Sequence, residues 1–177
     1  QMNAGQTEAA LATYREFAEQ YPDDANAPRA LVKASELART SALAVGRNYV
    51  ALNDDQRKVW TAGMDASIRA GSEVIERFPK SDQVSAALAS ILETEKLRVV
   101  AGIATPQEIE RFFTELAAKH ADTPDAAGKI RFAHAAFIHP DKPDRAFEMM
   151  KEAYRPDLLL TARHLDLYGT LLIQKGN

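Results

Sequence analysis

The fold is indicated most clearly by residues 14–34, which read YREFAEQYPDDANAPRALVKA. A helix ends at an aromatic residue, Tyr21, and Pro22 interrupts the helical pattern directly after it. A helix rich in small residues follows, and Leu31 is its first large apolar side chain. Because the connection between the two helices is very short, we expect them to run antiparallel as a hairpin.

The same arrangement returns along the chain, which indicates an internal repeat. In three copies, a leucine or isoleucine lies ten residues beyond the aromatic residue or histidine that ends the preceding helix. These pairs are Tyr21 and Leu31, Phe78 and Leu88, and His120 and Ile130. A fourth, weaker copy ends at Tyr154, which lies 34 residues beyond His120, whereas the first three copies are 57 and 42 residues apart. The repeat is therefore irregular, and some of its helices must be long.

Helix starts are marked by capping residues. Thr105 is followed by a proline and then by Glu108, which together form a capping box. Thr123 precedes a proline in the same way, and Asn53 and Asp141 suit two further helix starts. Apolar residues recur at helical spacing throughout, and no segment alternates as a strand would. We therefore predict a single all-α domain over residues 1–177, with helices at 6–21, 25–52, 54–78, 82–101, 106–120, 124–139, 142–154 and 158–175.

Two segments carry a family resemblance. Residues 14–34 and residues 76–88, ERFPKSDQVSAAL, resemble the repeat of bacterial envelope tetratricopeptide (TPR) proteins of the outer-membrane-assembly lipoprotein and Tol-Pal-associated type. The 34-residue interval is the period of that repeat. The resemblance implies an irregular TPR-like α-solenoid, which is a right-handed superhelix of about four antiparallel helix hairpins. It also implies a protein-interaction role, often in the periplasm.

The composition indicates a folded chain and argues against several kinds of partner. Hydrophobic residues make up 46% and charged residues 27% of the 177 residues. The net charge is −3, from 22 basic and 25 acidic residues, so we do not expect nucleic acid as a partner. There is no cysteine, and no apolar run approaches the roughly 20 residues that span a bilayer. We therefore expect neither disulfides nor membrane insertion.

The histidines are the first candidates for a metal or catalytic site. His134 and His139 lie five residues apart, which directs their side chains to different sides of one helix, and His120 and His164 belong to other helices. We expect His120 to take the aromatic position of the repeat, His139 to lie at a helix C-terminus, and the other two to be partly exposed. No catalytic, cofactor-binding or metal site is predicted, and we do not expect an enzyme.

Two sets of charged residues remain. The acidic pairs Asp23-Asp24 and Asp54-Asp55 open helices, where negative charge is stabilised by about 0.3–1 kcal/mol, so capping explains them. A second set falls on the first helices of the hairpins. Its side chains could bind the carboxylate groups of a peptide or stack on it. It comprises Arg57, Lys58, Trp60, Arg69 and Arg111. Trp60 and Met64 are four residues apart, and this helical spacing favours a core position for Trp60.

Three functions are consistent with these patterns. The first is a non-catalytic scaffold or interaction module for a protein or peptide, in the periplasm or cell envelope. The second is an architectural or regulatory segment of a larger protein, since the apolar helix at 158–175 lacks the polar outer face of a terminal cap. A second copy of the chain or a neighbouring domain would cover that helix. The third is a small-molecule-binding or enzymatic domain with a pocket in the groove.

Overall fold

The computed structural model describes residues 4–158, 160 and 162–176. Within these residues the chain forms eight α-helices, one short 3₁₀ helix and no strand, which confirms the predicted all-α class. The helices are α1 (Ala4–Gln20), α2 (Ala27–Val45), η1 (Tyr49–Ala51), α3 (Asp54–Arg77), α4 (Val84–Val100), α5 (Pro106–Lys119), α6 (Pro124–Ile138), α7 (Pro143–Ala153) and α8 (Ala162–Gln174). The chain divides into two compact units, unit 1 at residues 1–104 and unit 2 at residues 105–177.

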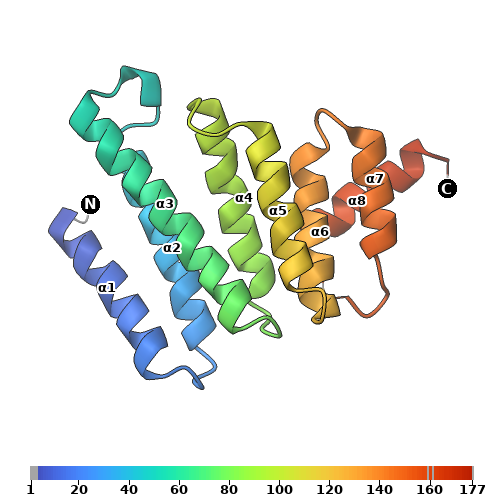
Figure 1. The fold of residues 1–177 in the computed structure, drawn as a ribbon, viewed down its shortest axis with the longest axis horizontal. Helices are drawn as coiled ribbons and strands as arrows, with labels where there is room; N and C mark the ends of the chain where they lie inside the picture. Colours follow the sequence, from blue (N-terminus) through green and yellow to red (C-terminus); the bar gives the residue numbers. More distant parts are fainter. Residues whose placement is uncertain (1–3, 159, 161, 177) are drawn as a thin grey trace. The chain divides into compact units, whose positions relative to one another are not determined.

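In unit 1, α2 packs against α1, α3 and α4, and α3 also packs against α4. Consecutive helices run antiparallel (Figure 1). The leucines that mark the repeat, Leu31 and Leu88, are fully buried in this unit. The end of α3 is tied to α1, because the Arg77 guanidinium donates a hydrogen bond of 2.7 Å to the carbonyl oxygen of Ala18.

A cluster of buried hydroxyl groups joins α2, α3 and α4. The Ser35 hydroxyl lies 2.8 Å from that of Ser90 and donates to the carbonyl oxygen of Ser67 at 2.8 Å. The Ser67 hydroxyl in turn lies 2.9 Å from that of Thr94. All four residues are buried, and each hydroxyl has at least one partner, so their burial carries little desolvation cost. Small hydroxyl residues thus let three helices approach closely while their polar atoms stay satisfied.

The second predicted helix, 25–52, is wrong at its end, because α2 stops at Val45. Gly46 follows, and a Cβ atom at that position would lie 2.5 Å from Leu52 Cδ2. The chain therefore turns at Gly46, and Leu52 packs back into a small core with Trp60 and Met64. Apolar residues beyond the glycine continue the helical spacing in the sequence, but they belong to this turn and to η1.

In unit 2, α6 packs against α5, α7 and α8, and α8 is inclined to its neighbours (Figure 1). The core contains Phe113, Ile130, Phe132, Met150 and Leu171. The predicted last helix, 158–175, begins too early, because α8 starts at Ala162. Leu158 instead packs against α6, where a Cβ atom on Gly128 would lie 2.9 Å from Leu158 Cδ2. Residues 159 and 161, which that prediction included, lie outside the described residues.

Two of the four predicted caps are confirmed, whereas Thr123 occupies the N-cap position of α6 without a side-chain capping bond and Asp141 does not cap α7. Asn53 and Thr105 both form complete capping boxes, with Gln56 and Glu108 respectively. Asp141 does not cap α7, because Lys142 occupies the N-cap position and makes no side-chain capping bond. Proline follows directly at the first position of that helix, and its fixed φ starts the helix without a side-chain cap.

Candidate functional site

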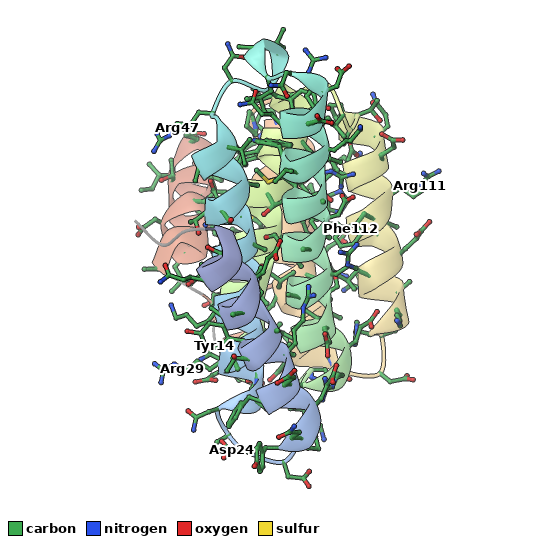
Figure 2. All side chains as sticks on the ribbon, turned by 90° about the vertical axis from the view of Figure 1, so that its left-hand side faces the viewer. Tyr14, Asp24, Arg29, Arg47, Arg111 and Phe112 are labelled. Atoms are coloured by element: carbon green, nitrogen blue, oxygen red, sulfur yellow. The ribbon has the colours of Figure 1, made fainter. Side chains whose placement is uncertain are left out.

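Three of the charged residues that the sequence singled out lie on α3 of unit 1, and the fourth lies in unit 2. Arg57 holds the η1 turn, because its guanidinium donates to the carbonyl oxygen of Val50 at 2.8 Å. Lys58 pairs with Asp55 at 3.2 Å, and Arg69 is exposed. Arg111 belongs to unit 2 and projects from α5 into solvent (Figure 2). The core position predicted for Trp60 is confirmed, since its side chain is 1% exposed.

Two of the four histidines differ from their predicted positions. His120 is confirmed at the C-cap of α5 and His139 at the C-cap of α6. His134 and His164 were predicted to be partly exposed, but both are buried, at 4% and 5% exposure. They pack in the aromatic core of unit 2, against Phe113 and Phe132 respectively. Among the described residues, no three His, Asp or Glu side chains are grouped so that they could hold a metal ion.

A groove of about 370 Å³ in unit 2 is the candidate site. We call it the unit 2 groove. It lies between α5 and α7, the first helices of two successive hairpins, and α6 contributes Arg131 and the buried His134. Its other lining residues are Thr114, Ala117 and Ala118 of α5 and Arg145, Met149 and Glu152 of α7. Small residues on α5 leave the space, while charged side chains on α6 and α7 border it.

A network of charges fixes one side of the unit 2 groove. Glu110 of α5 pairs with Lys142, and with Arg145 at 2.7 Å. The hydrogen bond from Lys142, assisted by the positive charges of Lys142 and Arg145, lowers the pKa of Glu110 despite its partial burial. The ion pair with Glu110 thereby fixes the Arg145 side chain at the groove. Arg131, by contrast, is exposed and makes no hydrogen bond or ion pair within the described chain.

His134 gives the groove an unusual polar group. Its ring stacks on Phe113, with centroids 5.8 Å apart and an angle of 16° between the planes. The Nε2 atom is buried and has no hydrogen-bond partner within the described residues. Burial is the largest influence on the pKa of His134 and lowers it. The charge of Glu110 raises this pKa, and the charges of Arg145 and Lys142 lower it. The net shift is downward, so the imidazole is neutral at pH 7. A buried polar atom without a hydrogen-bond partner carries a free-energy cost.

Acid is expected to destabilise unit 2 through His134. Its pKa in the folded chain is lowered from the ordinary value of 6.5, so the unfolded chain binds the proton more readily. The stability that the neutral imidazole contributes is therefore present above pH 6.5 and is lost as the pH falls through the folded-state pKa. Hydrogen exchange of α5, α6 and α7 at about pH 7.5 and about pH 5, corrected for intrinsic rates, measures the loss.

A His134→Phe variant provides the comparison, because it keeps a flat ring on Phe113 and cannot bind a proton. Its loss of protection over this pH range should be smaller than that of the wild type. Glu110 does not account for the difference, since its lowered pKa makes its contribution fall only below its ordinary value of 4.5. Equal losses in the two proteins would show that His134 does not titrate as its burial indicates.

The sequence did not identify the unit 2 groove, although part of its pattern was present. Arg131 and His134 are three residues apart on α6, and Arg145, Met149 and Glu152 recur at spacings of four and three on α7. These spacings place each set on one helix face. The packing of the α6 face against the α7 face is set by tertiary structure, and no local sequence pattern predicts it.

Comparisons of the chain with family models, with curated proteins and with solved structures found no match. The TPR-like resemblance therefore stays a prediction. No described helix combines the length and the apolar composition needed to cross a membrane.

Proposed function

We propose that the chain is a non-catalytic interaction module that binds a segment of a partner protein in the unit 2 groove. One observation carries this proposal: the groove is bordered by an exposed arginine, Arg131, that makes no ion pair or hydrogen bond within the described chain, beside the ring of His134. The Arg131 guanidinium is a donor that a carboxylate or carbonyl group of a bound polypeptide would satisfy. An arginine near an apolar floor is also a frequent hot spot of protein interfaces.

The form of the groove favours a polypeptide segment. Exposed side chains border it on all three helices, among them Thr114, Arg131 and Glu152. Met149 adds a flexible apolar contact between them, which adapts to different side chains. Such a mixture of apolar floor and charged rim is typical of protein interfaces.

The finer assignment rests on the resemblance and on the hairpins within each unit. We propose a TPR-like superhelix of four hairpins and a location in the periplasm or cell envelope. The antiparallel α1–α2 and α3–α4 pairs of unit 1 support the hairpin part of this assignment.

A second function is favoured by the last helix. Leu165 and Ile173 of α8 are 46% and 79% exposed, which is unusual for large apolar residues on one short helix. A segment of a larger protein, with a neighbouring domain or a second copy over α8, would bury them. This alternative concerns α8 and leaves the unit 2 groove free to act.

Site-specific photo-crosslinking tests the proposed function. A benzophenone side chain placed at Thr114, which lines the groove, should capture a partner protein from an extract of the source cells. The neighbouring Glu115 is exposed but does not line the groove, so the same group there is the matched control. Arg131→Glu should reduce capture at Thr114 by about tenfold or more, because it reverses a groove charge.

Two outcomes would argue against the proposal. Equal capture at both positions would mean that the groove is not the binding surface. A small molecule that co-purifies with the chain and is lost in Arg131→Glu would instead favour the third function, that of a small-molecule site.

A further inference from the structure

Unit 1 carries a second groove, formed along the line where α1 and α2 meet. Two adjacent hollows of about 320 and 330 Å³ lie on this line and share Tyr14 and Lys33. We call the pair the unit 1 seam. It runs from Asn26 to Thr40 on α2, about 21 Å at 1.5 Å per residue, which equals roughly four helical turns. Tyr14 and Arg29 lie on the same flank of unit 1 (Figure 2).

The two hollows repeat at a spacing of seven residues on α2. The first is lined by residues 26, 29, 30 and 33 of this helix, and the second by residues 33, 36, 37 and 40. Each set has the spacing i, i+3, i+4 and i+7, which is the four-residue hole that receives one side chain of a packed helix. The lining residues of α1, at 10, 13, 14 and 17, have the same spacing. Along α2 the two sets are therefore offset by about 10.5 Å, the rise of two helical turns.

Charge further restricts what fits the seam. Arg29 is exposed and makes no ion pair or hydrogen bond within the described chain. Lys33 lies between the hollows and pairs with Glu36 at 2.7 Å, in an exposed pair that contributes little to stability. The floor beneath them is apolar and aromatic, with Tyr14, Phe17 and Ala30. A complementary helix would therefore carry apolar side chains in the hollows and an acidic side chain beside Arg29.

From this geometry we infer that the unit 1 seam binds an amphipathic α-helix of a partner protein. The helix places two large apolar side chains, seven residues apart, in the two hollows, and an acidic side chain faces Arg29. An extended segment would advance about 3.3 Å per residue and would not keep this two-turn register. The inference concerns a different unit from the proposed function and does not depend on it.

A second copy of the described chain offers no helix with two fully exposed large apolar residues seven apart. The large apolar residues that are exposed in the described chain are Tyr21, Val50, Val59, Val100, Tyr154, Leu165 and Ile173. No two of these lie seven residues apart on one helix; the nearest approach is Leu165 and Ile173, eight apart on α8. We therefore assign the seam to a helix of another protein.

Binding of synthetic helices to the whole chain tests the inference. The first probe is a fluorescent helical peptide of about 21 residues, with two leucines seven apart and glutamates flanking the first leucine. The second has the same composition with the leucines five apart, which points them to different sides of the helix. Fluorescence anisotropy should show that the first probe binds at least about tenfold more tightly than the second. Equal binding, or no binding of the first probe, would overturn the inference.

Charge reversal locates the bound probe. Arg29→Glu should weaken binding of the first probe about tenfold, and a third probe with lysines in place of the glutamates should restore it. Arg47→Glu changes the net charge equally at the other end of unit 1 and should have no effect (Figure 2). A charge effect at Arg47 as large as that at Arg29 would mean non-specific attraction, which would overturn the seam as the site.

Two further outcomes would also overturn it. If Arg131→Glu in the unit 2 groove abolished probe binding, the probe would be bound there instead of at the seam. If the wild-type chain formed dimers in sedimentation that Arg29→Glu abolished, the occupant would be a second copy of the chain. Circular dichroism of each variant confirms that the helices are retained.

Discussion

Trp60→Ala is expected to lower the free energy of unfolding of unit 1 by about 3–5 kcal/mol. Trp60 is 1% exposed and packs with Ala42, Leu52 and Met64 beneath the η1 turn. The centroid of its indole lies 5.1 Å from that of the Tyr49 ring, so truncation would leave a cavity under the η1 turn. Urea unfolding followed by circular dichroism measures the loss. Hydrogen exchange in α2 and α3 shows where it acts, with protection reduced about 100-fold or more.

Two control variants distinguish the loss of the aromatic ring from a general effect of substitution at this site. The indole Nε1 of Trp60 is buried and has no hydrogen-bond partner within the described residues. Trp60→Phe therefore removes an unsatisfied donor while it keeps an aromatic ring, and we expect it to cost less than about 2 kcal/mol. Val59→Ala, at a neighbour that is 57% exposed, should change stability by less than about 0.5 kcal/mol. A small effect of Trp60→Ala would show that the η1 turn collapses onto the vacated space.

Most of the helical pattern could be predicted from the sequence because its signals are local. The capping boxes at Asn53 and Thr105 are set by residues three apart, and both are confirmed. The same holds for the buried repeat positions Leu31, Leu88 and Ile130, which follow helix breaks at fixed distance. Local chemistry at these positions agrees with the tertiary packing, and the helix boundaries there are close to those expected.

The errors arose where distant residues decide the structure. The helix predicted to run through Gly46 ends there because Leu52 packs into the Trp60 cluster, a contact that the helical spacing of the sequence does not indicate. Leu158 continues an apolar pattern in the sequence but fits against Gly128 of α6 outside any helix. In both cases a glycine admits a leucine from elsewhere in the chain. The sequence shows the glycine but not which side chain will approach it.

The candidate sites were missed for the same reason. Arg57 and Arg111 were singled out because charged residues on first helices suit peptide binding, but Arg57 holds the η1 turn and Arg111 extends into solvent. Arg131 and Arg29, which border the two grooves, belong to second helices of their hairpins. The hollows exist because small residues such as Ala30 and Ala118 line them. Small residues in this chain also allow close helix packing. Only the structure shows which of them line a hollow and which of them lie between packed helices.

Gly63→Leu is expected to destabilise unit 1 by about 3 kcal/mol or more, because α2 and α3 are in close contact at this glycine. A Cβ atom on Gly63 would lie 2.8 Å from the Cβ atom of Ala42 and 3.1 Å from the carbonyl oxygen of Ala38. Neither atom is the end of a flexible side chain, so the helices themselves must separate. That movement also strains the hydroxyl cluster at Ser35 and Ser67 on the same two helices. The midpoint of urea unfolding, followed by circular dichroism, measures the effect.

A smaller substitution at Gly63 is the sharper test, because the sign of its effect on the free energy of unfolding is predicted. Gly63→Ala gains about 1 kcal/mol of helix propensity, yet it should still be destabilising, because the clash costs about 1–3 kcal/mol. Gly169→Ala makes the same change in α8, where nothing lies within 4 Å of the added Cβ, and it should stabilise its helix by up to about 1 kcal/mol. Gly71→Ala should fall between them, since its two nearest neighbours belong to the side chain of Ile91 and the nearest backbone atom is 3.4 Å away. If Gly63→Ala were as stabilising as Gly169→Ala, α2 and α3 would not be in close contact at Gly63.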